Sequence, residues 1–267
     1  MKCPTEALPM MRCNQILDAA EQLIESQGIV SFKFSQLAKE VGCSTGTLYK
    51  FFERKEDVLV CLFLRSATSN HLPIFVNKYP DLTAQEKVLL PILFTFETIK
   101  RSKSFFTLRS VSVNTMVWQL ASAEKIERFK KRINAFWGWF TDSLNEAVAR
   151  GELEATPLQV KELVQGITFY LTGSLTQFES QLIAPEYLSN RRETCYRHLA
   201  KLMAQYKWNK PITPELFDCL EQRSSSFFDK HYRDHMSCSA CSALAGNSSV
   251  CQYSLERLDC GWFRRRR

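Results

Sequence analysis

Apolar side chains recur every three to four residues through most of the first 208 positions, which is the spacing of one face of an α-helix. Alternation with a period of two is short and lacks hairpin turn residues, so no strand is predicted. We therefore expect an all-α protein. The approximate helical ranges are 16–27, 37–41, 45–52, 55–68, 83–101, 104–120, 123–150, 157–181 and 185–207.

Several residues mark the ends of these helices. Gly28, Gly42 and Gly151 each follow an apolar periodic segment, where a left-handed residue commonly ends a helix. Thr156 and Gln159 stand three residues apart around a proline, and together they form a capping box at the start of a long helix. These residues locate the expected ends of the helices more closely than periodicity alone does.

The character of the sequence changes after residue 208. One further helix is predicted over about 214–236, and the chain beyond it is rich in serine, cysteine and alanine. We therefore place a domain boundary near residue 208 and predict a cysteine-rich extension beyond it. A second boundary is expected after the short helices of the first 55 residues. The three expected ranges are 10–55, 56–208 and 209–267.

Composition narrows the class of protein only in part. The chain has 267 residues, of which 45% are hydrophobic and 24% charged, as in an ordinary globular protein. No run approaches 18 apolar residues and the first 14 positions carry no apolar signal core, so we expect a soluble, cytoplasmic protein without membrane association. The formal charge of +7 hints at a polyanionic partner, although residues 1–60 hold seven basic and eight acidic side chains.

Three short helices are expected within the first 55 residues, and Gly42, Cys43 and Ser44 join the second to the third. A turn of three to four residues containing glycine is the spacing of a helix-turn-helix, in which the following helix enters the major groove of DNA. Ser44 is well placed to cap that third helix. Cys43 is interpreted as a small apolar residue, with a redox sensor as the alternative.

The side chains around this turn resemble the signature of the tetracycline-repressor (TetR/AcrR) family. The resemblance implies a homodimeric transcriptional regulator, most simply a repressor that leaves its operator when a small molecule binds. The upstream segment 16–28 also matches the first helix of the family at the right distance. The residues that carry the signature are Leu37, Ala38, Val41, Gly42, Ser44, Gly46, Leu48, Tyr49, Phe52, Lys55, Glu56 and Val58.

The resemblance also indicates which residues meet DNA. Gly46 has no side chain, so its backbone can approach DNA closely, and Lys50 can donate to guanine, although a solvated lysine is the alternative. Lys33 stands where the family often has a serine or threonine cap; either Ser31 or Ser35 replaces it or the cap is weaker. The full set expected at the DNA is Lys33, Ser35, Gln36, Ser44, Thr45, Gly46, Thr47, Tyr49, Lys50, Phe51 and Lys55.

For the second domain the resemblance implies two partners, a second copy of the chain and a small inducer. Helices over about 157–181 and 186–207 are expected to pair with their copies, and small residues such as Gly166 and Gly173 favour close approach. Aromatic side chains suit a cavity for an apolar ligand, with ordinary core packing as the alternative. The candidates are Phe94, Phe105, Trp118, Phe136, Trp137, Phe140, Phe169 and Tyr170.

The extension carries five cysteines, and the spacing of the last four, Cys238, Cys241, Cys251 and Cys260, is compatible with zinc, an iron–sulfur cluster, disulfides or no function. No resident cofactor is otherwise expected. Two alternatives to a ligand-released repressor stay open: a regulator gated by metal or redox state through these cysteines, and a DNA-organising protein without an inducer. No constellation of residues indicates an enzyme.

Overall fold

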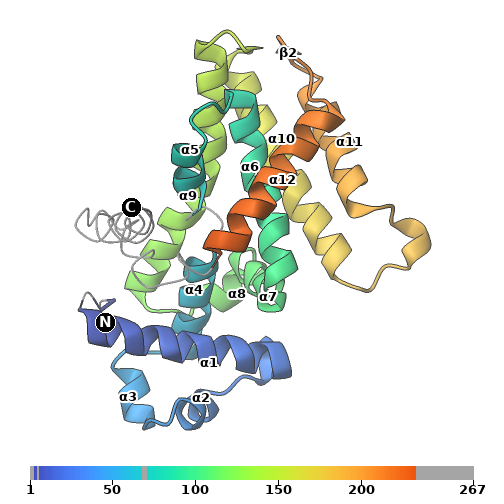
Figure 1. The fold of residues 1–267 in the computed structure, drawn as a ribbon. Coiled ribbons are helices and arrows are strands. Elements are labelled where there is room, and N and C mark those ends of the chain that lie inside the picture. The colour runs from blue at the N-terminus through green and yellow to red at the C-terminus, as the bar shows by residue number, and fades with distance from the viewer. Residues whose placement is uncertain (1–2, 5, 68–70, 233–267) are drawn as a thin grey trace, which may run out of the picture. The chain divides into compact units, whose positions relative to one another are not determined.

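The computed structural model describes residues 3–4, 6–67 and 71–232, and within them it confirms an all-α fold (Figure 1). The helices are α1 (Ala7–Ser31), α2 (Phe34–Glu40), α3 (Thr45–Tyr49), α4 (Lys55–Ser66), α5 (Leu72–Lys78), α6 (Ala84–Arg101), α7 (Lys103–Ser112), α8 (Thr115–Trp118), α9 (Ala123–Ala149), α10 (Pro157–Glu179), α11 (Arg191–Met203) and α12 (Pro214–His231). A 3₁₀ turn spans Pro185–Tyr187.

The structure departs from the expected elements in five main places. Helix α1 begins at Ala7, before the expected start at residue 16, and continues to Ser31 across a kink at Gly28. Helix α5 was not predicted, and the single helix expected over 104–120 is two, because the Asn114 side chain caps a new start at α8. The helix expected from residue 185 begins only after Asn190, which caps α11. The last difference is a pair of two-residue strands, β1 (Leu153–Glu154) and β2 (Lys207–Trp208), too short for alternation to reveal.

The described residues divide into two compact units. The first unit consists of residues up to 67 together with 101–133 and 231–232, and the second consists of 71–100 and 134–230. In the described part of the chain, no helix is both long enough and apolar enough to cross a membrane.

The core of the first unit is built around α1. Ile16 and Leu17 on α1 pack with Leu48 of α3 and with Phe52, and all four side chains are almost wholly buried. Helix α2 contacts both α1 and α3, and α4 contacts α1 and α7 (Figure 1). The apolar face of the predicted first helix therefore supports the whole helix-turn-helix.

A buried ion-pair network also ties α1 to α4. Arg65 of α4 is 1% exposed and pairs with Asp18 at 2.6 Å and with Glu21 at 2.7 Å. The hydroxyls of Ser102 and Ser104 donate to the other oxygen of Glu21, at 3.1 and 2.6 Å. Glu21 on α1 therefore links α1 to α4 and to the serine residues at the start of α7.

The core of the second unit depends on an aromatic cluster. Phe75 of α5, Phe94 of α6 and Phe227 of α12 are each fully buried, with ring centroids 5.1 to 6.0 Å apart. Phe228 is also buried and packs edge-on against Phe94 at 4.9 Å. Helix α12 lies beyond residue 208, in the segment that the sequence assigned to the extension, yet its apolar face completes this core.

Candidate nucleic-acid interface

The turn between α2 and α3 is fixed by backbone chemistry. Gly42 adopts a φ of 66°, and its N–H donates to the Lys39 carbonyl at 3.1 Å. The Cys43 N–H donates to the Ala38 carbonyl at 2.9 Å, which completes a Schellman motif. Because a left-handed φ strains a side-chain-bearing residue, glycine is required at position 42.

The start of α3 is held by Ser44, as the sequence predicted. Its hydroxyl accepts from the Thr47 N–H at 3.1 Å and lies 3.0 Å from the Thr47 hydroxyl. Leu48 points into the core and is fully buried, so the first residues of α3 face outward. The cap and the buried leucine together orient this five-residue helix.

Most of the residues expected at DNA lie on the surface of this region. Tyr49 is 53% exposed although its ring packs 5.2 Å from that of Phe34, so this side chain is partly packed and still accessible. Gln36 and Thr47 are half-buried. The exposed members of the set are Lys33, Ser35, Ser44, Thr45, Gly46, Tyr49 and Lys50.

Gly46 has no structural reason to be glycine within the chain. Its φ is not in the left-handed region, and a Cβ at this position would meet only the Ser44 hydroxyl at 3.6 Å, an ordinary contact. In a helix, glycine costs about 1 kcal/mol relative to alanine. A glycine that neither the backbone nor the packing requires is the residue expected where an external molecule approaches closely.

We expect Gly46→Ala to separate folding from DNA binding. The free energy of unfolding should stay the same or rise by up to about 1 kcal/mol, because alanine favours the helix. Operator affinity should fall by about tenfold or more, or about 1.4 kcal/mol, because the methyl group keeps DNA from the backbone. Denaturant titration and fluorescence anisotropy measure the two effects, and unchanged operator affinity would contradict a close approach at this position.

Two residues of the expected set are engaged within the chain. The Lys55 ammonium donates to the Val30 carbonyl at 3.2 Å and lies 5.5 Å from the centre of the Phe32 ring. The Phe51 ring is half-buried and packs against the core of the first unit, 6.4 Å from Phe52. Lys55 must therefore exchange internal partners to reach a phosphate, and Phe51 contributes chiefly to packing.

The amino end of α2 lacks a strong side-chain cap. Lys33 is the N-cap residue, and no side chain there accepts a hydrogen bond from the first turn. Neither Ser31 nor Ser35 takes that role, so the cap is weak. The Lys33 side chain remains exposed.

Two positioning contacts escaped the sequence analysis. The Arg12 guanidinium on α1 donates to the Val41 carbonyl at 3.2 Å, which satisfies the carboxyl end of α2. The Asp57 carboxylate, 1% exposed, accepts from the Glu53 N–H at 2.8 Å and the Ser122 N–H at 2.7 Å. An acidic residue in the first turn of α4 is the only sequence signal for the second contact, and its distant donor has none.

The aromatic residues proposed for ligand binding do not form one group. Phe105 and Trp118 belong to the first unit, where Trp118 packs 6.1 Å from Phe129. In the second unit Phe94 is in the core cluster, and Phe136 packs 5.3 Å from Phe140. The remaining pairs there are Trp137 with Phe169, at 6.0 Å, and Tyr170 stacked on His198, at 5.2 Å.

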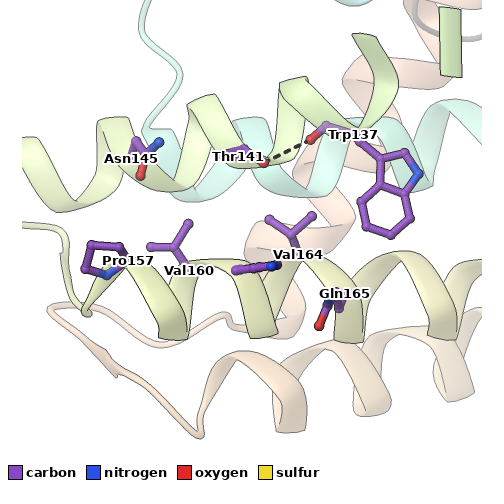
Figure 2. Close-up of a pocket in the computed structure, with 8 residues that line it drawn as sticks. Trp137, Thr141, Asn145, Pro157, Val160, Val164 and Gln165 are labelled. Carbon is purple, nitrogen blue, oxygen red and sulfur yellow. Dashed lines mark hydrogen bonds between the residues drawn. The ribbon is translucent and has the colours of Figure 1, made fainter. Parts of the chain in front are cut away.

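A surface groove of about 420 Å³ lies between α9 and α10 (Figure 2). Trp137 from α9 and Val160 and Val164 from α10 give it apolar walls, and Lys161 supplies one positive charge. Trp137 is the one member of the aromatic set that lines it. The groove is open to the surface, since Phe169 beside Trp137 is 63% exposed.

The predicted metal ligands Cys238, Cys241, Cys251 and Cys260 lie outside the described residues. Within residues 3–4, 6–67 and 71–232, no group of three or more His, Cys, Asp or Glu side chains is arranged to hold a metal ion. The described cysteines differ in burial: Cys219 is exposed, Cys43 is half-buried, and the buried ones are Cys3, Cys13, Cys61 and Cys195.

Comparison with known proteins identifies relatives of this architecture. Residues 16–61 match the family model described as bacterial regulatory proteins, tetR family. The fatty acid metabolism regulator protein of Bacillus subtilis is 28% identical over 166 residues, which cover 60% of this chain and 75% of that protein.

Two solved structures share the fold. The transcriptional regulator FadR from Bacillus subtilis, in complex with stearoyl-CoA, has a TM-score of 0.52 and 20% identity, over 71% of this chain and 97% of that one. A TetR/AcrR family regulator from Thermobifida fusca has a TM-score of 0.53 and 20% identity, over 74% of this chain and 99% of that one. At these identities the likeness is one of fold.

Proposed function

This chain belongs to the TetR family of DNA-binding transcriptional regulators, and from that premise we propose that it is a homodimeric, cytoplasmic repressor released from its operator by a small apolar ligand. The observation that carries the proposal is the exposed surface of α3, where Gly46 in the first turn and Lys50 at the C-cap are open to an external molecule while Ser44 and Leu48 hold the helix in place. Such a helix is suited to the major groove.

The chemistry of the exposed side chains distinguishes those suited to contact bases from those suited to contact phosphates. The exposed ammonium of Lys50 can donate to the O6 and N7 atoms of guanine, and so read sequence. Exposed Thr45 and Tyr49 hydroxyls and the Lys33 ammonium suit phosphate oxygens, which set the register without reading bases. Neutralised phosphates release counterions, so operator affinity should fall with rising salt.

Dimerisation through α10 and α11 is supported by apolar side chains that the single chain leaves at its surface. On α10, Leu158 is 64% exposed and Phe169 is 63% exposed. Gly173 has open space around the position of a Cβ, whereas a Cβ at Gly166 would meet Leu202 of α11 at 3.4 Å. Gly166 therefore serves packing within the chain, and Gly173 is the glycine free to approach a second copy.

For the ligand we propose a long acyl chain on coenzyme A. The groove between α9 and α10 has apolar walls and a volume within the usual range for small-molecule sites, about 300–1,000 Å³. Lys161 at its edge offers a charge to an anionic head group. The regulator from Bacillus subtilis whose fold is similar was solved with stearoyl-CoA, which makes this class the first to test.

The proposal is tested with DNA captured from random sequence by the purified protein. We expect a palindromic site, and Lys50→Ala should weaken binding to it by about 1–3 kcal/mol when the lysine reads a base. Anisotropy titrations on the operator and on scrambled DNA measure the loss. An equal loss on both sequences would show that Lys50 contacts only phosphate.

The ligand is tested on the same complex by adding stearoyl-CoA, with free coenzyme A as the control for the head group. A repressor of the proposed kind releases the operator when stearoyl-CoA is added but not when free coenzyme A is added. A ligand shifts a conformational equilibrium only when it binds one state more tightly than the other. Sequence-independent binding that no acyl-CoA alters would instead support a DNA-organising protein.

A further inference from the structure

Three side chains far apart in the sequence meet in the first unit, and the proposed function uses none of them. Cys3 precedes α1, Cys61 lies on α4 and Lys125 lies in the first turn of α9. The Lys125 ammonium donates to the Cys3 sulfur at 3.0 Å, and the Cys61 side chain also hydrogen bonds with Cys3.

All three side chains are withdrawn from solvent. Cys3 is 9% exposed, Cys61 is 4% exposed and Lys125 is 2% exposed. A buried ammonium is costly unless it has an anionic partner, and a thiolate on Cys3 supplies that partner. Lysine is seldom fully buried, so this one needs a specific explanation.

The charge state of the cluster follows from these contacts. The hydrogen bond from Cys61 and the positive charges of Lys125 and Arg128 lower the pKa of Cys3 to about 5, although burial opposes them. The pKa of Lys125 is raised by the two neighbouring thiols, against the effect of its burial. At neutral pH the cluster therefore holds a thiolate and an ammonium side by side, with a second sulfur in contact.

Burial alone does not produce this state, and Cys195 on α11 demonstrates the difference. Its side chain is 1% exposed, but desolvation raises its pKa to about 12. Arg191 acts to lower the pKa of Cys195, but its charge does not offset desolvation, whereas the Cys3 sulfur also takes part in hydrogen bonds with Cys61 and Lys125. The thiolate is the reactive form of cysteine, so Cys3 is the nucleophile of the pair.

We propose that Cys3 and Cys61 form an oxidisable thiol pair, in which Lys125 activates Cys3 towards hydrogen peroxide and Cys61 resolves the product as a disulfide. This inference is independent of the proposed inducer and of the cysteines beyond residue 232. It places a redox modification between the segment before α1 and the helix that follows the helix-turn-helix.

The chemistry occurs in two steps. The Cys3 thiolate attacks one oxygen of the peroxide, the O–O bond breaks, and Cys3 becomes a sulfenic acid while the leaving hydroxide takes the proton of Cys61 to form water. The Cys61 thiolate then attacks the Cys3 sulfur, and the departing hydroxide takes one proton from solvent as a second water. Two thiols are oxidised to one disulfide, and one peroxide is reduced to two waters.

The test treats the reduced full-length protein with hydrogen peroxide and maps each cysteine by peptide mass spectrometry. The expected product is a peptide that links Cys3 to Cys61 and separates under dithiothreitol, while Cys195 stays reduced. In Cys61→Ala the sulfenic acid on Cys3 should persist and be trapped by dimedone. Oxidation of Cys3 no faster than Cys195, or linkage of Cys3 to other cysteines without Cys61, would overturn the proposal.

Lys125→Met tests whether the lysine charge activates Cys3. The methionine side chain is unbranched and of similar length to lysine, so it can fill the same buried site without the charge. In the unmodified protein the rate of Cys3 alkylation by iodoacetamide should already be near its plateau at pH 6, because the thiolate forms above a pKa of about 5. In Lys125→Met the rate at pH 6 should fall by about tenfold or more, and the profile should shift to higher pH. Circular dichroism confirms that the variant is folded, and an unchanged pH profile in a folded variant would contradict the role of the lysine.

Discussion

A chain cut after residue 208 is expected not to fold, although the sequence pattern alone made that position look like a domain boundary. The cut removes Phe217, Leu220, Phe227 and Phe228 of α12, each no more than 2% exposed. Truncation of one buried phenylalanine costs about 3–5 kcal/mol. Loss of three such phenylalanines and one leucine is therefore comparable to or larger than the total stability of a typical domain, about 5–15 kcal/mol.

A chain cut after residue 232 is the control, since it keeps α12 and the aromatic cluster around Phe94. Far-ultraviolet circular dichroism during heating should give a cooperative transition for this protein and none for the shorter one. A cooperative transition in both would mean that α12 is dispensable. The chain that ends at residue 232 is also the one to use for testing metal or redox gating through the cysteines beyond that residue. Because this chain keeps α12, a loss of operator binding would not be caused by unfolding.

The second large effect is expected from the ion-pair network between α1 and α4. Glu21→Ala removes an acceptor shared by Arg65, Ser102 and Ser104, and it leaves a guanidinium that is 1% exposed with a weakened set of partners. Removal of one member of a buried ion pair costs about 3–5 kcal/mol because the other charge remains desolvated. Urea denaturation should show this loss, and operator affinity should fall with it, because α1 supports α2 and α3.

Asp18→Ala is the matched control for Glu21→Ala. Asp18 pairs with the same Arg65 at 2.6 Å, but its side chain is 65% exposed, so solvent replaces it readily. A pair with an exposed partner contributes about 1 kcal/mol or less. Equal destabilisation by the two substitutions would mean that burial of the acceptor does not decide the strength of the network.

The helix-turn-helix was predictable because its determinants are local. Gly42 and Cys43 end α2 by donating hydrogen bonds to carbonyls three and five positions before them, and Ser44 caps α3 through an N–H three positions away. Leu48 and Phe52 face the core because they stand four residues apart on one helical turn. Long helices with strong caps, such as α10 at Thr156, were predictable for the same reason.

Contacts between distant segments were not predictable. Cys3 and Cys61 look like two ordinary small apolar residues, and nothing in their neighbourhood indicates that Lys125, 122 positions from Cys3, donates to the Cys3 sulfur. Phe227 and Phe94 likewise carry no sign that they share a core. Periodicity shows which face of a helix is apolar but not which other helix covers it.

The sequence by itself therefore determined the helical class, the helix-turn-helix and the resemblance to the TetR family, since turns, caps and helix faces depend on residues within a few positions of one another. The tertiary structure alone decided that α12 completes the second core, that Arg65 anchors the first helix, and that Lys125 donates a hydrogen bond to the sulfur of Cys3. Those properties arise from desolvation and charge pairing, which exist only once the chain has brought distant side chains together out of water.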